Sequence, residues 1–255
     1  MRRVPLFALL LAVLVSGLTG PPSYAGVERL PPGTDVDYQL GGATAMPAHV
    51  GIIVRDRNAR PAAGRYNICY VNGFQTQPDE KRFWRARWWL VLKHDGRAVV
   101  DEAWGEWLLD LRTPRKRKAI ARVMGAWTRG CAKDGFAAVE YDNLDSYTRS
   151  DGLLRRKHAL AFARLLVSRA HRAGLAVGQK NLAEYGGSRL FDFAVSESCA
   201  QYDECDSYVA AYGDQVLLVE YRKADFDEAC EEYGDRLPIV LRDRDLSPEG
   251  VHEWC

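Results

Sequence analysis

Short apolar runs recur along the chain, and longer segments with helical periodicity separate many of them. Most runs are rich in Val, Ile, Leu and Tyr and have the length of a β-strand. They predict strands at Val36–Leu40, His49–Val54, Tyr66–Val71, Trp88–Leu92, Ala137–Tyr141, Leu175–Gly178, Phe191–Val195, Gln215–Glu220 and Ile239–Leu241. Their apolar residues are continuous instead of alternating with polar ones, which is typical of parallel strands buried on both faces.

Two of the intervening segments predict amphipathic helices. In the first, apolar side chains recur at helical spacing, at Ile120, Val123, Met124, Trp127 and Cys131. In the second, a single stripe made of Leu154, His158, Ala161 and Leu165 stops at Gly174. Helices that alternate with buried parallel strands indicate an α/β fold.

Polar residues at the strand ends favour a closed barrel over an open, doubly wound sheet. They are Arg55-Asp56, Asn72, Asp142-Asn143, Lys180-Asn181, Glu197 and Glu220-Tyr221. In a barrel these ends converge at one mouth, where such enzymes keep their active sites, whereas an open sheet spreads them along an edge. Neither G-x-G-x-x-G nor a Walker sequence supports a nucleotide site. We therefore expect a (β/α)₈ TIM barrel, in which the weakest of the nine strands, Trp88–Leu92, is surplus.

The first 25 residues have the order of a cleaved secretory signal. Arg2 and Arg3 precede an apolar run from Leu6 to Val15, and Ser23-Tyr24-Ala25 provides a cleavage site. The apolar run is too short to span a bilayer. We expect a secreted protein in which residues 26–255 form one barrel domain, with no membrane association after cleavage.

Charge and cysteine content narrow the class of protein further. The 35 basic and 34 acidic side chains nearly balance, so we expect no nucleic-acid partner. The six cysteines all follow the expected cleavage point, and in an oxidising compartment they predict disulfides. Many pairings are open; we favour Cys69–Cys131, Cys199–Cys205 and Cys230–Cys255. Because no C-x-x-C occurs and the histidines are scattered, we expect no metal or cofactor. We also expect a monomer.

The segment Glu140-Tyr141-Asp142-Asn143-Leu144-Asp145 is the strongest candidate for chemistry. It places three acids and an amide at the end of a buried strand, where charge density usually persists because a ligand or transition state uses it. Strand alternation points Glu140 and Asp142 to the same side, toward the barrel interior. The alternative is a solvated acidic loop with an Asx turn.

Glu197 is the second candidate acid, and Glu220 at the next strand end is a third. Two carboxylates facing across a cleft are what glycosidic cleavage requires. The alternative for Glu197 is an exposed loop residue beside a structural disulfide. Lys180 is either a substrate-binding or pKa-lowering group or a structural ion-pair partner of the acids. Five tyrosines near the mouth offer flat faces to a sugar: Tyr38, Tyr70, Tyr141, Tyr147 and Tyr221. Serine and cysteine nucleophiles are disfavoured, since no G-x-S-x-G elbow is present.

Taken together, these segments resemble glycoside hydrolase family 114, the endo-α-1,4-polygalactosaminidases, which are (β/α)₈ barrels. The matching pieces, in order, are Asp37-Tyr38-Gln39-Leu40, Ile68-Cys69-Tyr70, Glu106-Trp107-Leu108-Leu109-Asp110, Gly135-Phe136, Glu140-x-Asp142-Asn143-x-Asp145, Ala170-His171-x-x-Gly174-Leu175, Lys180-Asn181, Phe191-Asp192-Phe193-Ala194-Val195, Glu197-x-Cys199 with Tyr202 and Cys205, and Val219-Glu220-Tyr221. The set covers nearly all of the chain after the signal.

The resemblance implies hydrolysis within a polymer of α-1,4-linked galactosamine. Carried onto this chain, the nucleophile is Asp142 and the acid/base is Glu197; the two roles are exchangeable, and Glu140 or Glu220 are alternatives to either. Expected substrate-binding residues are Tyr38, Asp56, Tyr70, Glu140, Asn143, Asp145, Lys180, Asn181, Glu220 and Tyr221. A cationic amino sugar explains the additional acids at the strand ends, because Glu140, Asp145 and Glu220 would pair with its ammonium groups.

One residue departs from the family pattern. Tyr141 stands where a smaller residue or proline is expected, and we expect it to narrow the cleft beside Asp142. Two other functions remain open: a barrel that binds polysaccharide without cutting it, and a hydrolase of another α-linked amino sugar or neutral glycan.

Overall fold

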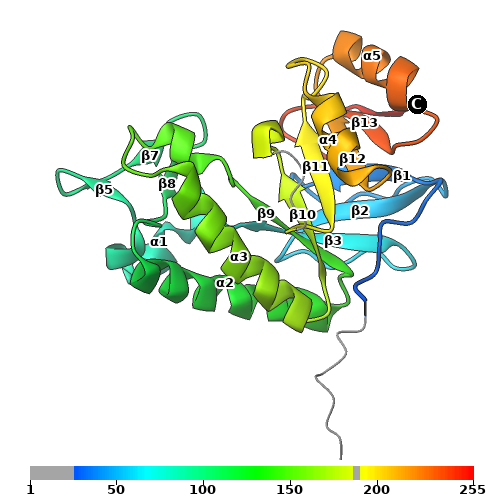
Figure 1. Ribbon diagram of the computed structural model, residues 1–255. Coiled ribbons are helices and arrows are strands. Elements are labelled where there is room, and N and C mark those ends of the chain that lie inside the picture. Colours follow the sequence, from blue (N-terminus) through cyan, green and yellow to red (C-terminus); the bar gives the residue numbers. More distant parts are fainter. Residues whose placement is uncertain (1–25, 186–189) are drawn as a thin grey trace, which may run out of the picture.

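The computed structural model describes residues 26–185 and 190–255, and a long, mostly parallel sheet runs through them (Figure 1). The expected signal peptide lies outside these residues. The strand order of the sheet is β1-β2-β3-β9-β10-β11-β12-β13-β14. All neighbours pair in parallel except the final pair, in which β14 runs antiparallel to β13.

The parallel strands coincide with eight of the nine predicted ones. They are β1 (Asp35–Gln39), β2 (Val50–Asp56), β3 (Tyr66–Asn72), β9 (Ala138–Asp142), β10 (Ala176–Lys180), β11 (Phe193–Glu197), β12 (Val216–Glu220) and β13 (Ile239–Arg242), and β14 is His252–Trp254. Trp88–Leu92 is surplus to the barrel, as expected, and Trp88–Leu90 forms the 3₁₀ helix η2. The apolar residues Leu90, Val91 and Leu92 are buried in the cluster that also contains α2, so their burial requires no place in the barrel.

Side chains from β13 and β14 close the sheet toward β1 into a nearly complete barrel. The Arg242 guanidinium donates to Asp37 at 3.0 Å and also to the backbone carbonyl of Tyr38. The indole N–H of Trp254 donates to the carbonyl of Val36 at 2.8 Å. These contacts bring the first and last parallel strands together, which confirms the predicted (β/α)₈ class.

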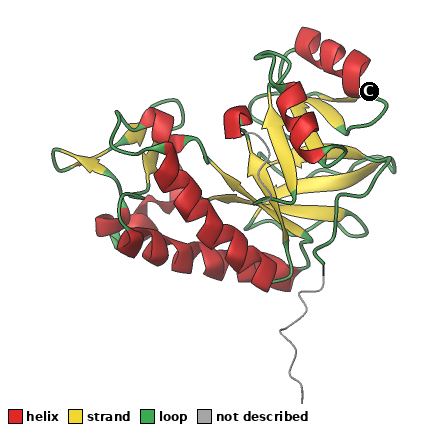
Figure 2. Cartoon of the chain, in the orientation of Figure 1, coloured by secondary structure: helices red, strands yellow, loops and turns green. Residues whose placement is uncertain are grey.

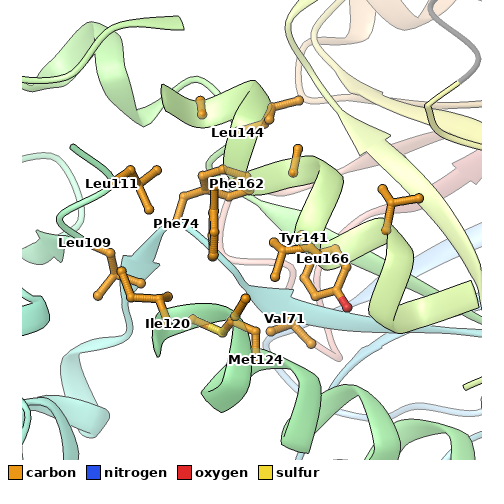
Figure 3. Close-up of a cluster of buried hydrophobic side chains, with 14 of the residues drawn as sticks. Val71, Phe74, Leu109, Leu111, Ile120, Met124, Tyr141, Leu144, Phe162 and Leu166 are labelled. Atoms are coloured by element: carbon orange, nitrogen blue, oxygen red, sulfur yellow. The ribbon is translucent and has the colours of Figure 1, made fainter. Parts of the chain in front are cut away.

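Apolar side chains pack on both faces of the strands. Inside the barrel, alternate strand residues such as Ile52, Ile68 and Val195 form one cluster. Outside, a second cluster packs α2 (Pro114–Asp134) and α3 (Arg156–Arg172) against β3 and β9 (Figure 3). A third packs α4 (Cys205–Tyr212) and α5 (Lys223–Tyr233) against β11 to β13 (Figure 2). This packing explains why the strands have continuous apolar sequences.

Both predicted amphipathic helices form. In α2, the Thr113 hydroxyl accepts a hydrogen bond from the backbone N–H of Lys116, Pro114 occupies the first turn, and Gly135 follows with a φ of 97°. In α3, the buried face differs from the predicted stripe. It consists of Ala159, Phe162, Ala163, Leu166, Val167 and Ala170, while His158, Ala161 and Leu165 lie at its half-buried border.

Helices do not follow every strand. Loops of residues 40–49 and 57–65 connect β1 to β2 and β2 to β3. Between β3 and α2 lies an insertion, which contains β4 (Gln75–Thr76), η1 (Pro78–Glu80), α1 (Lys81–Arg85), η2, β5 (Lys93–His94), β6 (Arg97–Ala98), β7 (Val100–Asp101) and β8 (Glu106–Leu108). Strands β4, β8 and β7 form a small antiparallel sheet in this insertion. The remaining short elements are η3 (Ser146–Arg149) and η4 (Ala183–Tyr185).

The three predicted disulfides are confirmed. Cys69–Cys131 joins β3 to α2, Cys199–Cys205 closes the loop between β11 and α4, and Cys230–Cys255 ties the C-terminus to α5.

Among the residues described, no helix is long and apolar enough to cross a membrane.

Candidate active site

A cavity of about 570 Å³ opens at the carboxyl ends of the parallel strands. Eight of the residues expected at the site line it: Tyr70, Asp142, Asn143, Asp145, Lys180, Asn181, Glu197 and Tyr221. They come from the ends of β3, β9, β10, β11 and β12 or from the residues just beyond. Barrel closure therefore collects groups that are far apart in sequence, as the strand-end pattern predicts.

Asp142 is held in place at the end of β9. Its Oδ2 accepts a hydrogen bond from the Tyr70 hydroxyl at 2.8 Å, and its Oδ1 accepts one from the backbone N–H of Asn143 at 2.7 Å. Asn143 has a φ of 68°, which turns the chain directly after the strand. These two hydrogen bonds orient the carboxylate of Asp142. Its side chain remains 19% exposed and is open to the cavity.

Glu197, at the end of β11, is also held by two neighbours. The Tyr221 hydroxyl donates to Oε1, and the Asn181 amide donates to Oε2 at 3.2 Å. The Asn181 side-chain oxygen in turn accepts the backbone N–H of Glu197 at 2.8 Å. With 25% of its side chain exposed, Glu197 presents a second fixed carboxylate to the same cavity.

Lys180 joins the two carboxylates. Its Nζ lies 3.5 Å from Asp142 Oδ1 and 3.1 Å from Glu197 Oε2, and its side chain is only 2% exposed. Burial alone would lower the pKa of Lys180, but the three carboxylates of Asp142, Glu140 and Glu197 raise that pKa well above its usual value. Lys180 is therefore a permanent cation between the two candidate catalytic acids.

Glu140 and Tyr38 lie below the cavity and support Lys180. Glu140 Oε1 accepts from Lys180 Nζ at 3.0 Å and from the Tyr38 hydroxyl, while Lys180 also donates to the Tyr38 oxygen at 2.9 Å. Burial raises the pKa of Glu140 to about 6, and Lys180 opposes this rise. Glu140 is 0% exposed and Tyr38 1% exposed, and neither lines the cavity, contrary to expectation.

Asp56 and Glu220 do not line the cavity either. The Gln77 amide donates to Asp56 at 3.1 Å on the side of the insertion. Glu220 has the opposite strand phase to Tyr221, so it points outward, where it accepts the backbone N–H of Ala200 at 3.1 Å. Of Glu220 and Tyr221, only the inward-facing Tyr221 lines the cavity.

The expectation that Tyr141 narrows the cleft is wrong. Tyr141 alternates with Glu140 and Asp142, and its ring therefore faces the helices, inside the cluster drawn in Figure 3. Its hydroxyl lies 2.5 Å from the Thr128 hydroxyl on α2. Tyr147, which also does not line the cavity, donates to Glu184 at 3.0 Å.

Several cavity residues were not predicted. They are Leu40, Gly41, Asp101, Ala103, Trp104, Glu106, Arg149, Ser198, Tyr202, Arg244, Asp245 and Leu246. The Asp101–Glu106 group belongs to the insertion, whose short strands carry little periodic signal. Tyr202 and Trp104 are 62% and 60% exposed, an unusual exposure for large aromatic side chains. Leu40, Glu106 and Tyr202 belong to motifs of the family resemblance, which assigned them no role at the site.

One group of described side chains has the spacing of a metal site, formed by Cys199, Cys205 and Glu220. The two sulfurs are joined in a disulfide, so they lack the thiolates that bind metal ions. The candidate catalytic carboxylates of Asp142 and Glu197 instead lie beside the ammonium group of Lys180.

Comparisons with known proteins bear on the fold and on the family of the chain. The chain resembles the structure of Aspergillus fumigatus Ega3 in complex with galactosamine, with a TM-score of 0.73 and 23% identity over 91% of this chain and 99% of that one. It also resembles the glycoside hydrolase domain of PelA from Pseudomonas aeruginosa, with a TM-score of 0.56 and 17% identity over 87% of this chain and 98% of that one. A search of curated protein sequences finds no significant match. The profile of Glycoside-hydrolase family GH114 matches residues 19–255, and the chain belongs to that family of glycosidases.

Proposed function

We propose that this protein is a secreted, endo-acting glycoside hydrolase that cleaves α-1,4-galactosaminidic bonds, with Asp142 as nucleophile and Glu197 as acid/base. The observation that carries the proposal is the pair of oriented, partly exposed carboxylates, both in contact with Lys180 and open to one cavity. Glycosidic cleavage needs such a pair, one group to attack C1 and one to protonate the departing oxygen.

We propose a retaining reaction, as the resemblance to family 114 implies. Asp142 Oδ1 and Glu197 Oε2 lie 3.5 Å and 3.1 Å from one lysine nitrogen, so these two oxygens are no farther apart than the sum of those distances. Carboxyl groups about 5–5.5 Å apart are typical of retaining enzymes, and inverting enzymes need roughly 6.5–9.5 Å to admit a water. Asp142 would then form a covalent glycosyl ester, and Glu197 would afterwards deprotonate the water that releases it.

The charge of the cavity supports a cationic substrate. Six acids line it against three cations, Arg149, Lys180 and Arg244, so the lining has a net negative charge. The exposed aromatic rings of Trp104 and Tyr202 line it as well. Carboxylates attract the ammonium groups of a deacetylated amino sugar, and aromatic rings offer flat apolar surfaces to sugar faces. The galactosamine named in the complex of the similar Aspergillus structure is such a sugar.

Secretion rests on two features of the chain. The first 25 residues have the composition of a signal peptide, and the following residues contain three disulfides. Disulfides persist in oxidising compartments and are rare in the cytosol. A secreted hydrolase would meet its polymer outside the cell.

The test is hydrolysis of a defined α-1,4-galactosamine polymer, with the products identified by mass spectrometry. We expect wild type to release a ladder of oligomers, and Asp142→Asn and Glu197→Gln to release at least about a thousandfold less. The matched controls are Asp151→Asn and Glu204→Gln. Both change exposed or half-exposed acids in adjoining loops that do not line the cavity, and both variants should retain wild-type activity.

Two results would contradict the proposal in different ways. If wild type binds the polymer without releasing oligomers, the protein is a polysaccharide-binding barrel. If wild type does not hydrolyse this polymer but cleaves a polymer of another α-linked amino sugar or a neutral glycan in a substrate panel, the mechanism stands and the substrate assignment fails.

A further inference from the structure

Glu106 occupies an unusual position at the wall of the cavity. It begins β8 in the insertion, and its Oε2 accepts a hydrogen bond from the Asn72 amide at 2.8 Å, with the Asn143 amide at 3.5 Å. Oε1 has no hydrogen bond in the described part of the chain, and Glu106 is only 8% exposed. The residue lines the cavity, so a carboxylate oxygen without a partner faces the space beside Asp142.

No cation of the described chain neutralises Glu106 by direct contact. Arg149 is the nearby candidate, but its guanidinium is already shared, at 2.7 Å from Asp101 and 2.9 Å from Asp145. Burial, together with the nearby charges of Asp142 and Asp101, raises the pKa of Glu106 to about 7, and the Asn72 hydrogen bond opposes the rise. A buried carboxylate without a counter-ion is costly, and a bound cation removes much of that cost.

Trp104 lies in the same turn of the insertion, between β7 and β8. Its side chain is 60% exposed, and it lines the cavity together with Glu106. An exposed indole at the edge of a polar cavity offers a flat face on which one side of a sugar ring can stack. The insertion therefore brings an apolar platform and an unpartnered carboxylate to one side of Asp142.

We propose that Glu106 and Trp104 form a sugar subsite that recognises the free ammonium group of a 2-amino-2-deoxy sugar. The proposal rests on the proposed function and adds the residue that selects the deacetylated form. In the subsite, Trp104 stacks against the ring and Glu106 Oε1 accepts the ammonium protons. An N-acetylated sugar lacks this positive charge and adds an acetyl group, so it would leave Glu106 unpaired and would bind weakly.

The test measures binding separately from hydrolysis. In the inactive Asp142→Asn background, calorimetry compares a short α-1,4-galactosamine oligomer with the same oligomer after N-acetylation. We expect Glu106→Gln, added to this background, to weaken binding of the free amine form roughly ten- to a hundredfold, and to leave the acetylated form nearly unchanged. Glu102→Gln is the matched control, because Glu102 is an exposed acid of the same turn that does not line the cavity.

The ratio of the two affinities is measured on one protein preparation, so a partly unfolded variant does not imitate the effect. Equal loss for both oligomers, or no loss for either, would overturn the subsite and leave the proposed function standing. Unchanged binding together with abolished hydrolysis in the Glu106→Gln single variant would also overturn it, because Glu106 would then act in the chemistry. If wild type neither binds nor cleaves the galactosamine oligomer, the proposed function fails and the subsite fails with it.

Discussion

Lys180 balances the negative charge at the barrel mouth. It contacts three carboxylates, from Glu140 below and from Asp142 and Glu197 at the cavity, and it is nearly inaccessible to solvent. Of the two roles considered from sequence, the ion pair is present in the structure, and a role in binding substrate stays a prediction. Lys180 is a structural ion-pair partner of Glu140, and it is also the group that holds the two catalytic candidates close together.

Replacing this cation is expected to change the pH dependence of activity as well as stability. In Lys180→Met, Glu140 loses the cation that opposes the rise of its pKa and takes up a proton at higher pH, so we expect the acid limb of the kcat/KM profile to move upward and kcat to fall. Leaving Glu140 buried without its partner costs about 3–5 kcal/mol of unfolding free energy. A pH–rate profile and urea titrations would measure both effects.

The control for this variant is Lys157→Met, which removes an exposed lysine on α3. It should leave the acid limb and the unfolding free energy near their wild-type values. If Lys180→Met gave a wild-type pH profile with reduced stability, the lysine would be purely structural.

The inward-facing residues of the site were predictable because strand alternation and barrel closure are regular. Glu140 and Asp142 share a face of β9, as expected, and only the depth of Glu140 below the cavity was missed. Glu220 shows the limit of this reasoning, since a shift of one residue exchanges it with Tyr221 between the outer and inner faces. Sequence alone does not fix that phase in a strand with apolar residues on both faces.

Some elements of the fold are easier to predict from the sequence than others. The eight parallel strands are continuous apolar runs, and α2 and α3 carry apolar residues at helical spacing, so both patterns are visible locally in the sequence. The strands of the insertion between β3 and α2 are only two or three residues long, too short to show a period in the sequence. Its contribution to the cavity, including Glu106 and Trp104, therefore could not be predicted.

Two of the disulfides should differ in their effects on the unfolding free energy and on KM. Cys69–Cys131 spans 62 residues and joins β3 to α2, so replacing both cysteines with alanine should lower the unfolding free energy by about 4 kcal/mol and reduce activity little below the melting transition. Cys199–Cys205 spans only 6 residues, and its removal should cost about 2 kcal/mol.

The shorter bridge also anchors the loop that carries Ser198 and Tyr202 into the cavity. Its removal should raise KM more than removal of the longer bridge does. Urea unfolding and steady-state kinetics on both double variants would test this, and the reverse ranking in KM would contradict it.

At the scale of the whole molecule, several acids are buried in a way that makes stability depend on pH. Burial raises the pKa of Glu106 and Glu220 to about 7 and that of Glu140 to about 6, from ordinary values of 4.5. Each of these groups binds a proton more tightly in the folded chain than in the unfolded one. Their contribution to the unfolding free energy is therefore greatest below pH 4.5 and is lost as the pH rises to about 7.

Glu220→Gln isolates one of these groups. Glu220 is 0% exposed and its Oε2 has no hydrogen-bond partner among the described residues. At pH 8 the variant should exceed wild type in unfolding free energy by an amount on the order of 1–3 kcal/mol, and near pH 4.5 the two proteins should be equal. Urea titrations at both pH values give the comparison, and a difference that does not change with pH would refute the explanation.

The barrel as a whole brings Asp142 and Glu197 together across one cavity, and the central claim is that they act there as nucleophile and acid/base on α-1,4-linked galactosamine. The most direct measurement is the reaction of Glu197→Ala with a galactosamine oligomer that carries a dinitrophenyl leaving group at its α-anomeric carbon, which departs without protonation, in the presence of azide, followed by NMR of the product. Azide needs no general base, so it should rescue turnover and yield the α-glycosyl azide from the covalent Asp142 intermediate. A β-glycosyl azide, or no rescue in a variant that still binds the oligomer, would contradict the assignment.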